Sequence, residues 1–240
     1  MNANPTLPFS PVLSCQNVAK SYNGFYALNG LTLHLPRGRI VGLLGPNGSG
    51  KTTLLKMIAG LLVPTIGTIE VDGVPVGVET KKKVSYLPER SYFDGGMTVI
   101  DTVNYFSDFY TDFNRTMALE FIERLELPLK NKFRNLSKGM KEKLQLTLVM
   151  SRKADLYLLD EPIGGVDPAT RDVILDTMLR NYDRHGTILL STHLIYDIEP
   201  ILDDAVFIGG GRVMLADTCE HLRAATGMSV ERYFREVFRC

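Results

Sequence analysis

A glycine-rich loop between an apolar run and a helical pattern constrains this chain more than any other feature. The run GRIVGLLG (Gly38 to Gly45) is typical of a buried parallel strand, and Thr52 to Leu62 has the apolar spacing of a helix. The loop between them, GPNGSGKT, fits the spacing G-x-x-x-x-G-K-[ST] in the strand–loop–helix context that this motif requires. The sequence therefore predicts an α/β core built around this strand.

The same loop is predicted to bind phosphate. Its glycines allow backbone N–H groups to surround a phosphate group, and the start of the helix adds its dipole. Lys51 would reach the β and γ phosphates of a nucleotide, and the Thr52 hydroxyl would hold Mg²⁺. A chance glycine-rich turn is the alternative, which the spacing and context disfavour. The expected nucleotide contacts are Gly45, Pro46, Asn47, Gly48, Ser49, Gly50, Lys51, Thr52 and Thr53.

A second anion-binding helix start is predicted in NLSKGMKEKL, from Asn135 to Leu144. Ser137 can cap this helix, and Gly139 allows a bulky ligand to approach the backbone. The lysines of the segment, Lys138 among them, add positive charge nearby. One small domain thus carries two candidate phosphate sites.

Two carboxylates end an apolar strand in LYLLDE, from Leu156 to Glu161. Asp160 fits a residue that holds the magnesium shell, and Glu161 fits a group that orients or deprotonates an attacking water. His193 follows the next predicted strand, and ligands gather at the carboxyl ends of strands in an open parallel sheet. The catalytic candidates are therefore Lys51, Glu161 and His193. The alternatives are an ordinary acidic strand end and a structural or solvated histidine.

The remaining patterns predict one α/β domain over residues 1–240. We expect its nucleotide-binding core over about 1–88 and 153–225, a helical insertion over about 89–152, and a short C-terminal helix over 226–240. The sequence contains no internal repeat and no low-complexity linker that would divide the chain.

Composition limits the partners of the chain. Its 27 basic and 27 acidic residues balance, so no global field draws it to nucleic acid or to an anionic membrane. Cys15, Cys219 and Cys240 form neither a CxxC pair nor a zinc pattern, which favours a reducing cytosol. The first residues lack the features of a signal peptide, and no apolar stretch approaches the roughly 18 residues of a membrane span. If the protein works at a membrane, another polypeptide is expected to cross it.

Five motifs together resemble the ATP-binding subunit of an ABC transporter. They are GPNGSGKTT, LSKGM, LLDEP, GGVD and STH, in this order, and the resemblance covers roughly Leu13 to Ala225. It implies a P-loop NTPase fold with a mostly parallel central sheet, an antiparallel N-terminal β subdomain and a helical insertion. It also implies ATP and Mg²⁺ as ligands and ATP hydrolysis as the activity. Two ATP-binding subunits, identical or different, would sandwich two ATP molecules head to tail.

The resemblance also implies contacts outside the glycine-rich loop. Ser137 and Gly139 of one subunit would contact the γ-phosphate held by the loop of the other, and Asp167 would face that other subunit. In this family an aromatic residue upstream of the loop stacks on adenine, and Tyr22 matches it. The alternative for Tyr22 is an ordinary strand-edge tyrosine, with two other aromatic residues nearby as substitutes.

The chain departs from the family pattern in three segments, one of which, PIGGVD, replaces the more usual serine-glycine-leucine-aspartate loop but keeps Asp167 at the acidic position. Lys138 stands for the first of two paired glycines and Met140 for a glutamine; Lys138 either adds a cation near the ligand or is simply solvated. Glu89 stands where the family usually has a glutamine that touches the metal or its water. A carboxylate can bind Mg²⁺ but cannot donate a hydrogen bond when ionised, so Glu89 is a metal candidate with an open role.

The segments YLPE and STHLIYDIEPILDD are most similar to subunits of ABC-2-type exporters. This similarity implies an export ATPase at the cytoplasmic face of the cell membrane, attached to a transmembrane permease subunit, with no nucleic acid bound. The main alternative is a soluble ABC ATPase that acts on ribosomes or DNA. A small-molecule kinase and a non-catalytic ATP sensor are further alternatives, which LSKGM and the pair Glu161 and His193 disfavour.

Aromatic residues cluster in the predicted helical insertion. They would form either a groove for a helix of the membrane subunit, since aromatics favour interfaces, or the small core of the insertion. We favour the core for most of them, with Tyr92 and Phe93 as the better contact candidates. The cluster consists of Tyr92, Phe93, Tyr105, Phe106, Phe109, Tyr110 and Phe113.

Overall fold

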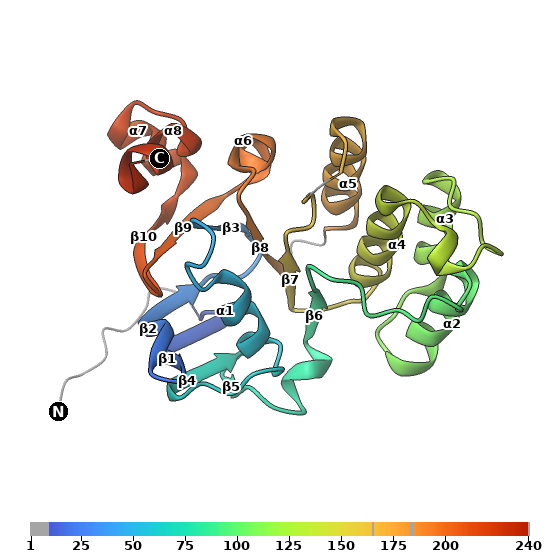
Figure 1. Cartoon of the computed structure of the whole chain (residues 1–240), viewed down its shortest axis with the longest axis horizontal. Coiled ribbons are helices and arrows are strands. Elements are labelled where there is room, and N and C mark those ends of the chain that lie inside the picture. The colour runs from blue at the N-terminus through green and yellow to red at the C-terminus, as the bar shows by residue number, and fades with distance from the viewer. Residues whose placement is uncertain (1–9, 165, 183–184, 240) are drawn as a thin grey trace.

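A six-stranded sheet forms the centre of the protein (Figure 1), in a computed structural model that describes residues 10–164, 166–182 and 185–239. Its strand order is β10-β9-β3-β8-β7-β6, and every neighbouring pair is parallel except β9 with β10. The strands are β3 (Ile40–Leu44), β6 (Val84–Leu87), β7 (Leu156–Asp160), β8 (Thr187–Thr192), β9 (Asp204–Gly209) and β10 (Arg212–Thr218).

Strands β3, β7 and β8 are buried along their whole length, as their continuous apolar runs predict for a sheet covered on both faces. Their register places Leu44 beside Thr192 and Asp160 beside Ser191. The carboxyl ends of the three strands therefore lie at one edge of the sheet. Loops that leave this edge bring together residues that are far apart in the sequence.

A second, antiparallel sheet of order β2-β1-β4-β5 packs with helix α1 (Lys51–Ile58) on one face of the central sheet (Figure 1). A tight turn at Asn23 and Gly24, both with positive φ, lets its first two strands pair up to that turn. The predicted antiparallel N-terminal β subdomain is thus confirmed. The strands are β1 (Leu13–Tyr22), β2 (Phe25–Leu35), β4 (Ile66–Val71) and β5 (Val74–Pro75).

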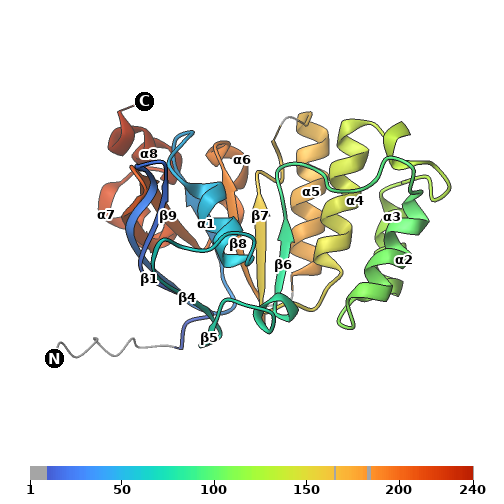
Figure 2. The same ribbon diagram turned by 60° about the horizontal axis from the view of Figure 1, so that its bottom comes forward.

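Helices between β6 and β7 form a separate group beside the β6 edge (Figures 1 and 2) and have their own apolar core. Phe106 is buried in this core, and Phe93, Tyr110 and Phe113 pack against it. The preference for a core role is therefore correct for these four, and Phe93 is not a surface contact as expected. The elements are η1 (Thr80–Lys82), which precedes β6, then α2 (Val99–Phe109), α3 (Arg115–Arg124), η2 (Phe133–Asn135) and α4 (Lys138–Met150).

The other face of the central sheet is covered by later helices (Figure 1). In the amphipathic C-terminal helix, the rings of Tyr233, Phe234 and Phe238 surround Phe207 of β9. Residues 183–184 lie outside the described residues, as does residue 240, the predicted end of the C-terminal helix. These elements are α5 (Pro168–Asn181), α6 (Ile195–Ile198), η3 (Glu199–Ile201), α7 (Cys219–Thr226) and α8 (Val230–Phe238).

Helix α1 ends at Ile58, four residues before the predicted Leu62. Gly60 adopts a φ of +70°, and the backbone N–H of Leu61 donates to the carbonyl of Lys56, which closes the helix. No helix in the described part of the chain is both long and apolar enough to span a membrane.

Candidate active site

The glycine-rich loop connects the end of β3 to the start of α1 and encloses a cavity of 380 Å³. Gly50 has a φ of +106°, and a Cβ at this position would lie 2.6 Å from the Ala27 carbonyl oxygen, so only glycine fits here. The described residues that line the cavity are Ala27, Asn47, Gly48, Ser49, Gly50, Lys51, Thr52, Thr53, Glu89 and Glu161.

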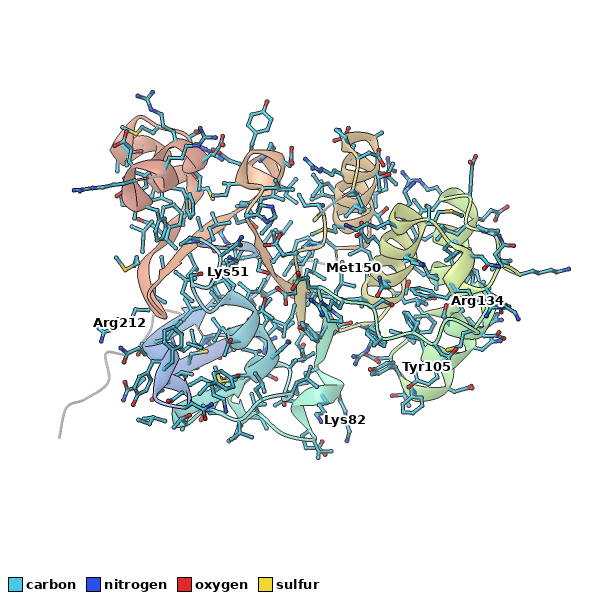
Figure 3. All side chains as sticks on the ribbon, viewed as in Figure 1. Lys51, Lys82, Tyr105, Arg134, Met150 and Arg212 are labelled. Atoms are coloured by element: carbon cyan, nitrogen blue, oxygen red, sulfur yellow. The ribbon has the colours of Figure 1, made fainter. Side chains whose placement is uncertain are left out.

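Lys51 lies near the middle of the molecule, at the start of α1 (Figure 3). Its Nζ donates hydrogen bonds to the carbonyl oxygens of Gly45, at 2.7 Å, and Pro46, at 3.2 Å. Burial lowers the pKa of this ammonium, while Glu161 and Asp160 favour its charged form. The ammonium therefore has neutral partners that an anionic ligand can replace with a stronger, charge-assisted contact.

Asp160 ends β7 and receives two hydroxyl hydrogen bonds on the same oxygen. Its Oδ1 lies 2.7 Å from Ser191 Oγ and 3.1 Å from Thr52 Oγ1. Burial raises the pKa of the Asp160 carboxyl, and the two hydroxyls oppose that shift. Sequence reasoning missed Ser191, although its place in the STH motif at the end of β8 is a usable signal. The register of β7 with β8 brings Ser191 to the carboxylate.

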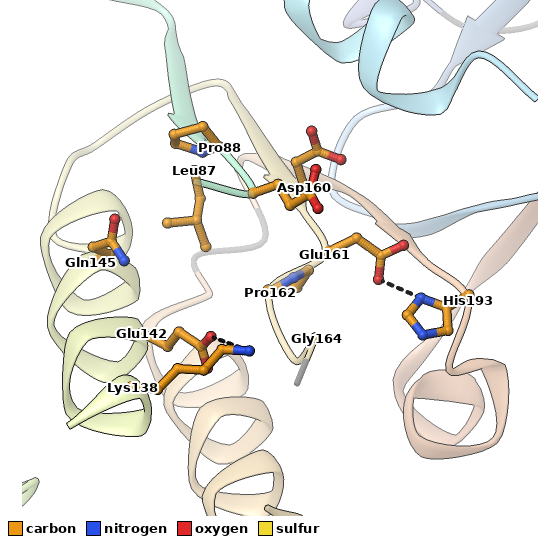
Figure 4. Close-up of a pocket in the computed structure, with 11 residues that line it drawn as sticks. Leu87, Pro88, Lys138, Glu142, Gln145, Asp160, Glu161, Pro162, Gly164 and His193 are labelled. Carbon is orange, nitrogen blue, oxygen red and sulfur yellow. Dashed lines mark hydrogen bonds and ion pairs between the residues drawn. The ribbon is translucent and has the colours of Figure 1, made fainter. Parts of the chain in front are cut away.

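Glu161 and His193, both predicted to lie at the carboxyl ends of strands, contact each other with 3.0 Å between Glu161 Oε2 and His193 Nδ1 (Figure 4). Glu161 has a φ of +52°, which is uncommon for a residue with a side chain. Its backbone N–H donates to the Ser191 carbonyl at 2.9 Å, which helps to hold this conformation. Such strained positions concentrate at functional sites, where the surrounding structure holds a side chain in one direction.

A second cavity, of 260 Å³, lies on the other side of Glu161 (Figure 4). Glu89 and Glu161 line both cavities and therefore form a shared wall. Across from them, Lys138 Nζ lies 3.9 Å from Glu142 Oε1. Burial raises the pKa of Glu142 to about 7, although Lys138 acts in the opposite direction.

A divalent cation fits the first cavity only with ligands from outside the protein. Across the described residues, no group of three or more histidine, cysteine or acidic side chains could hold a metal ion alone. Mg²⁺ usually takes one or two carboxylates and completes its shell with water and phosphate oxygens. The oxygens of Asp160, Thr52 and Glu89 therefore suit a cation that arrives with a phosphate ligand.

The remaining predicted contacts lie away from the first cavity. Ser137 caps α4 by accepting a hydrogen bond from the Met140 N–H at 3.2 Å, and Gly139 lies in the first turn of that helix. Asp167 caps α5 through Thr170, which lowers the pKa of the Asp167 carboxyl. None of Ser137, Gly139 and Asp167 is among the described residues that line the cavity of the glycine-rich loop. Within one chain, Lys138 of the second candidate phosphate site lines the cavity at Glu161, whereas Ser137 and Gly139 line neither cavity.

Tyr22 also lies outside that cavity lining. It ends β1 with 46% of its surface exposed, and Lys20 Nζ lies 5.4 Å from the centre of its ring. The ring is therefore accessible to a planar ligand, and its role as an adenine contact stays a prediction.

Comparison with known proteins gives one consistent result. The family model described as "ABC transporter" matches residues 28–164. The ABC transporter ATP-binding protein YtrB of Bacillus subtilis is 34% identical over 200 residues, which cover 82% of this chain and 68% of YtrB. The Nod factor export ATP-binding protein I of Burkholderia orbicola is 34% identical over 205 residues, which cover 82% of this chain and 67% of that protein.

Solved structures agree with the sequence relatives. A structure described as the ATP binding subunit of an ABC transporter superposes with a TM-score of 0.84 at 29% identity, covering 95% of this chain and 99% of that one. The dimeric bacterial ABC transporter cassette MJ0796 has a TM-score of 0.76 at 23% identity, covering 86% of this chain and 98% of that one; this is a likeness of fold.

Proposed function

This chain belongs to the ABC transporter family as an ATP-binding, ATP-hydrolysing subunit, and we propose that it drives an exporter from the cytoplasmic face of the cell membrane. The observation that carries the proposed site is the meeting of three strand ends at two adjoining cavities that share Glu89 and Glu161. Lys51 and Thr52 line the first cavity, Asp160 and His193 line the second, and Thr52 contacts Asp160 as Glu161 contacts His193. Export is supported by relatives that are named as Nod factor export proteins.

In the proposed reaction the phosphates of ATP enter the glycine-rich loop, where Gly45 to Thr53 surround them. Lys51 exchanges the carbonyls of Gly45 and Pro46 for the β and γ phosphates. Thr52, Asp160 and Glu89 would hold Mg²⁺, which would neutralise charge on the phosphates.

Glu161 orients the attacking water and accepts its proton. His193 acts beside it, because its Nδ1 contact holds the Glu161 carboxylate in one direction.

We further propose a head-to-tail pair of ATP-binding subunits. Ser137 and Gly139 of one subunit would contact the γ-phosphate in the other, Asp167 would face that subunit, and Tyr22 would stack on adenine. Support comes from the separation of these residues from the cavity of the glycine-rich loop within one chain. A second subunit gives the helix start at Ser137 a phosphate to bind.

A groove of 630 Å³ between α1, β6 and α2 is the proposed seat of the transmembrane permease subunit. Tyr92, Tyr105 and Phe109 line it and are 50%, 42% and 68% exposed, respectively; Tyr105 lies on α2, well removed from Lys51 (Figure 3). Lys56 and Arg90 line the same groove. The fitting occupant is an amphipathic helix with an apolar face and acidic flanking residues.

Hydrolysis is tested with Lys51→Ala and Glu161→Gln. Lys51→Ala should lose tight binding of Mg-ATP because it removes the ammonium from the phosphate site. Glu161→Gln should retain ATP binding and lose turnover, since an amide cannot accept the proton of water. Wild-type ATP affinity in Lys51→Ala would refute the phosphate site, and wild-type turnover in Glu161→Gln would remove Glu161 from the role of base.

The membrane role is tested with Tyr105→Glu, which places a negative charge in the proposed groove. This variant should co-purify less with the membrane subunit than wild type does, and Tyr196→Glu on exposed α6 is the matched control. Equal co-purification of both variants would argue against this groove. An ATPase that binds ribosomes or DNA and no membrane protein would refute the transport proposal.

A further inference from the structure

Tyr86 lies on β6 beside the strand that carries Asp160. In the parallel pairing of β6 with β7, Tyr86 is opposite Leu158, and Leu87 is opposite Leu159. Side chains alternate along a strand, so Tyr86 shares one face of the sheet with Leu158 and Asp160. The Tyr86 hydroxyl lies 3.5 Å from Asp160 Oδ2, the oxygen that neither Thr52 nor Ser191 contacts.

The same tyrosine side chain lines the groove that we assign to the membrane subunit. Tyr86 is half-buried and packs against the apolar cluster between α1 and the central sheet. Among the described groove residues, Tyr86 is the one with a recorded hydrogen bond to Asp160. One side chain therefore joins the groove to the carboxylate at the end of β7.

The hydroxyl can act only as a donor to the carboxylate, because an ionised carboxylate has no proton to give. Burial and the nearby Asp160 charge raise the pKa of Tyr86, so the phenol keeps its proton at neutral pH. Two donors on Oδ1 hold the carboxylate, and the longer Tyr86 contact, at 3.5 Å, is the one hydroxyl on the Oδ2 side among the described residues. Partners of this kind orient the ligands of a metal ion, and their loss weakens metal binding.

We propose that Tyr86 is a positioning residue that orients the Asp160 carboxylate for Mg²⁺ and couples that orientation to occupancy of the groove. This inference rests on the proposed function, because it takes Asp160 as a magnesium ligand and the groove as the seat of the membrane subunit. An occupant that presses on the Tyr86 ring changes the distance between the hydroxyl and Oδ2. The membrane subunit thereby alters the magnesium site without touching it.

The first test measures the Mg²⁺ concentration that gives half-maximal ATP hydrolysis by the full chain. Tyr86→Phe retains the ring and removes the hydroxyl, so this concentration should rise about threefold to tenfold, while the rate at saturating Mg²⁺ recovers toward that of wild type. Binding of a fluorescent ATP analogue in EDTA should change less than about twofold, since the phosphate loop is intact. Tyr196→Phe, an exposed tyrosine on α6, controls for loss of a hydroxyl elsewhere.

The second test repeats the Mg²⁺ titration on the subunit assembled with its membrane partner in lipid nanodiscs. Assembly should shift the half-saturating Mg²⁺ concentration of wild type and should shift that of Tyr86→Phe less. Identical Mg²⁺ curves for Tyr86→Phe and wild type, alone and assembled, would overturn the proposal while leaving the hydrolytic function intact. If wild type shows no Mg²⁺-dependent hydrolysis or ATP binding, both the proposed function and this inference are wrong.

Discussion

Mixing two inactive variants should restore ATP hydrolysis if each ATP site is built from two subunits. The first variant is Lys51→Ala, which damages the glycine-rich loop, and the second is Gly139→Asp, which damages the start of α4. A Cβ at Gly139 would lie 3.4 Å from the Thr170 side chain, an ordinary contact, so the aspartate has space. A negative charge also suits the first turn of a helix, and the variant should therefore fold.

The expected recovery follows from the separation of the two positions. Lys51 lines the cavity of its own glycine-rich loop and Gly139 does not, so the two lesions fall in different sites of a head-to-tail pair. In a mixed dimer one site contains both lesions and the other contains neither. Random assortment of equal amounts makes roughly half of the dimers mixed, each with one intact site, so the mixture should reach roughly a quarter of wild-type activity.

The assay measures phosphate release by each variant alone and by the mixture, with differently tagged chains to quantify mixed dimers. Each variant alone should be nearly inactive, because every site of its homodimer carries one lesion. Strong coupling between the two sites would lower the recovery, so ATP-dependent dimerisation is measured in parallel. Mixed dimers that bind ATP at the intact loop and still hydrolyse none would refute the arrangement across subunits.

Two further predictions concern stability. Arg152, whose side chain is 3% exposed, donates hydrogen bonds to both carboxylate oxygens of Asp112 and to the Val84 carbonyl. Arg152→Ala should therefore lower the free energy of unfolding, measured by urea titration, by about 3–5 kcal/mol. The exposed control Arg180→Ala should cost less than about 1 kcal/mol, and equal losses would contradict the prediction. Glu142→Gln should stabilise the protein above pH 7 by about 1–3 kcal/mol, with the gain disappearing toward pH 4.5. The pKa of Glu142 is higher in the folded chain than in the unfolded chain, so the folded state binds more protons between the two pKa values. The stability of the wild type therefore falls as pH rises. A difference in thermal unfolding between Glu142→Gln and wild type that is constant from pH 4.5 to 8 would refute this.

The sequence alone determined the glycine-rich loop and the fold around it. Gly50 has a positive φ and lies next to the Ala27 carbonyl, and only glycine fits there, so the residue type itself indicates this backbone conformation. The apolar runs of β3, β7 and β8 likewise indicate buried parallel strands, and Asp160 and Glu161 follow one of them at the expected edge. The placement of Glu161 and His193 at one edge was predictable because the carboxyl ends of parallel strands meet there, whereas their direct contact is seen only in the structure.

Only the tertiary structure decided which side chains touch across elements. Tyr86 faces Asp160 because β6 and β7 pair in one register, and a shift of one residue would turn Tyr86 to the opposite face. The packing of Phe93 into the helical core and the exposure of Tyr105 in the groove depend in the same way on how α2 sits against its neighbours. The spacing of apolar residues and glycines along the chain indicates local backbone structure. Strand register and helix packing, in contrast, arise from contacts between residues that are distant in sequence.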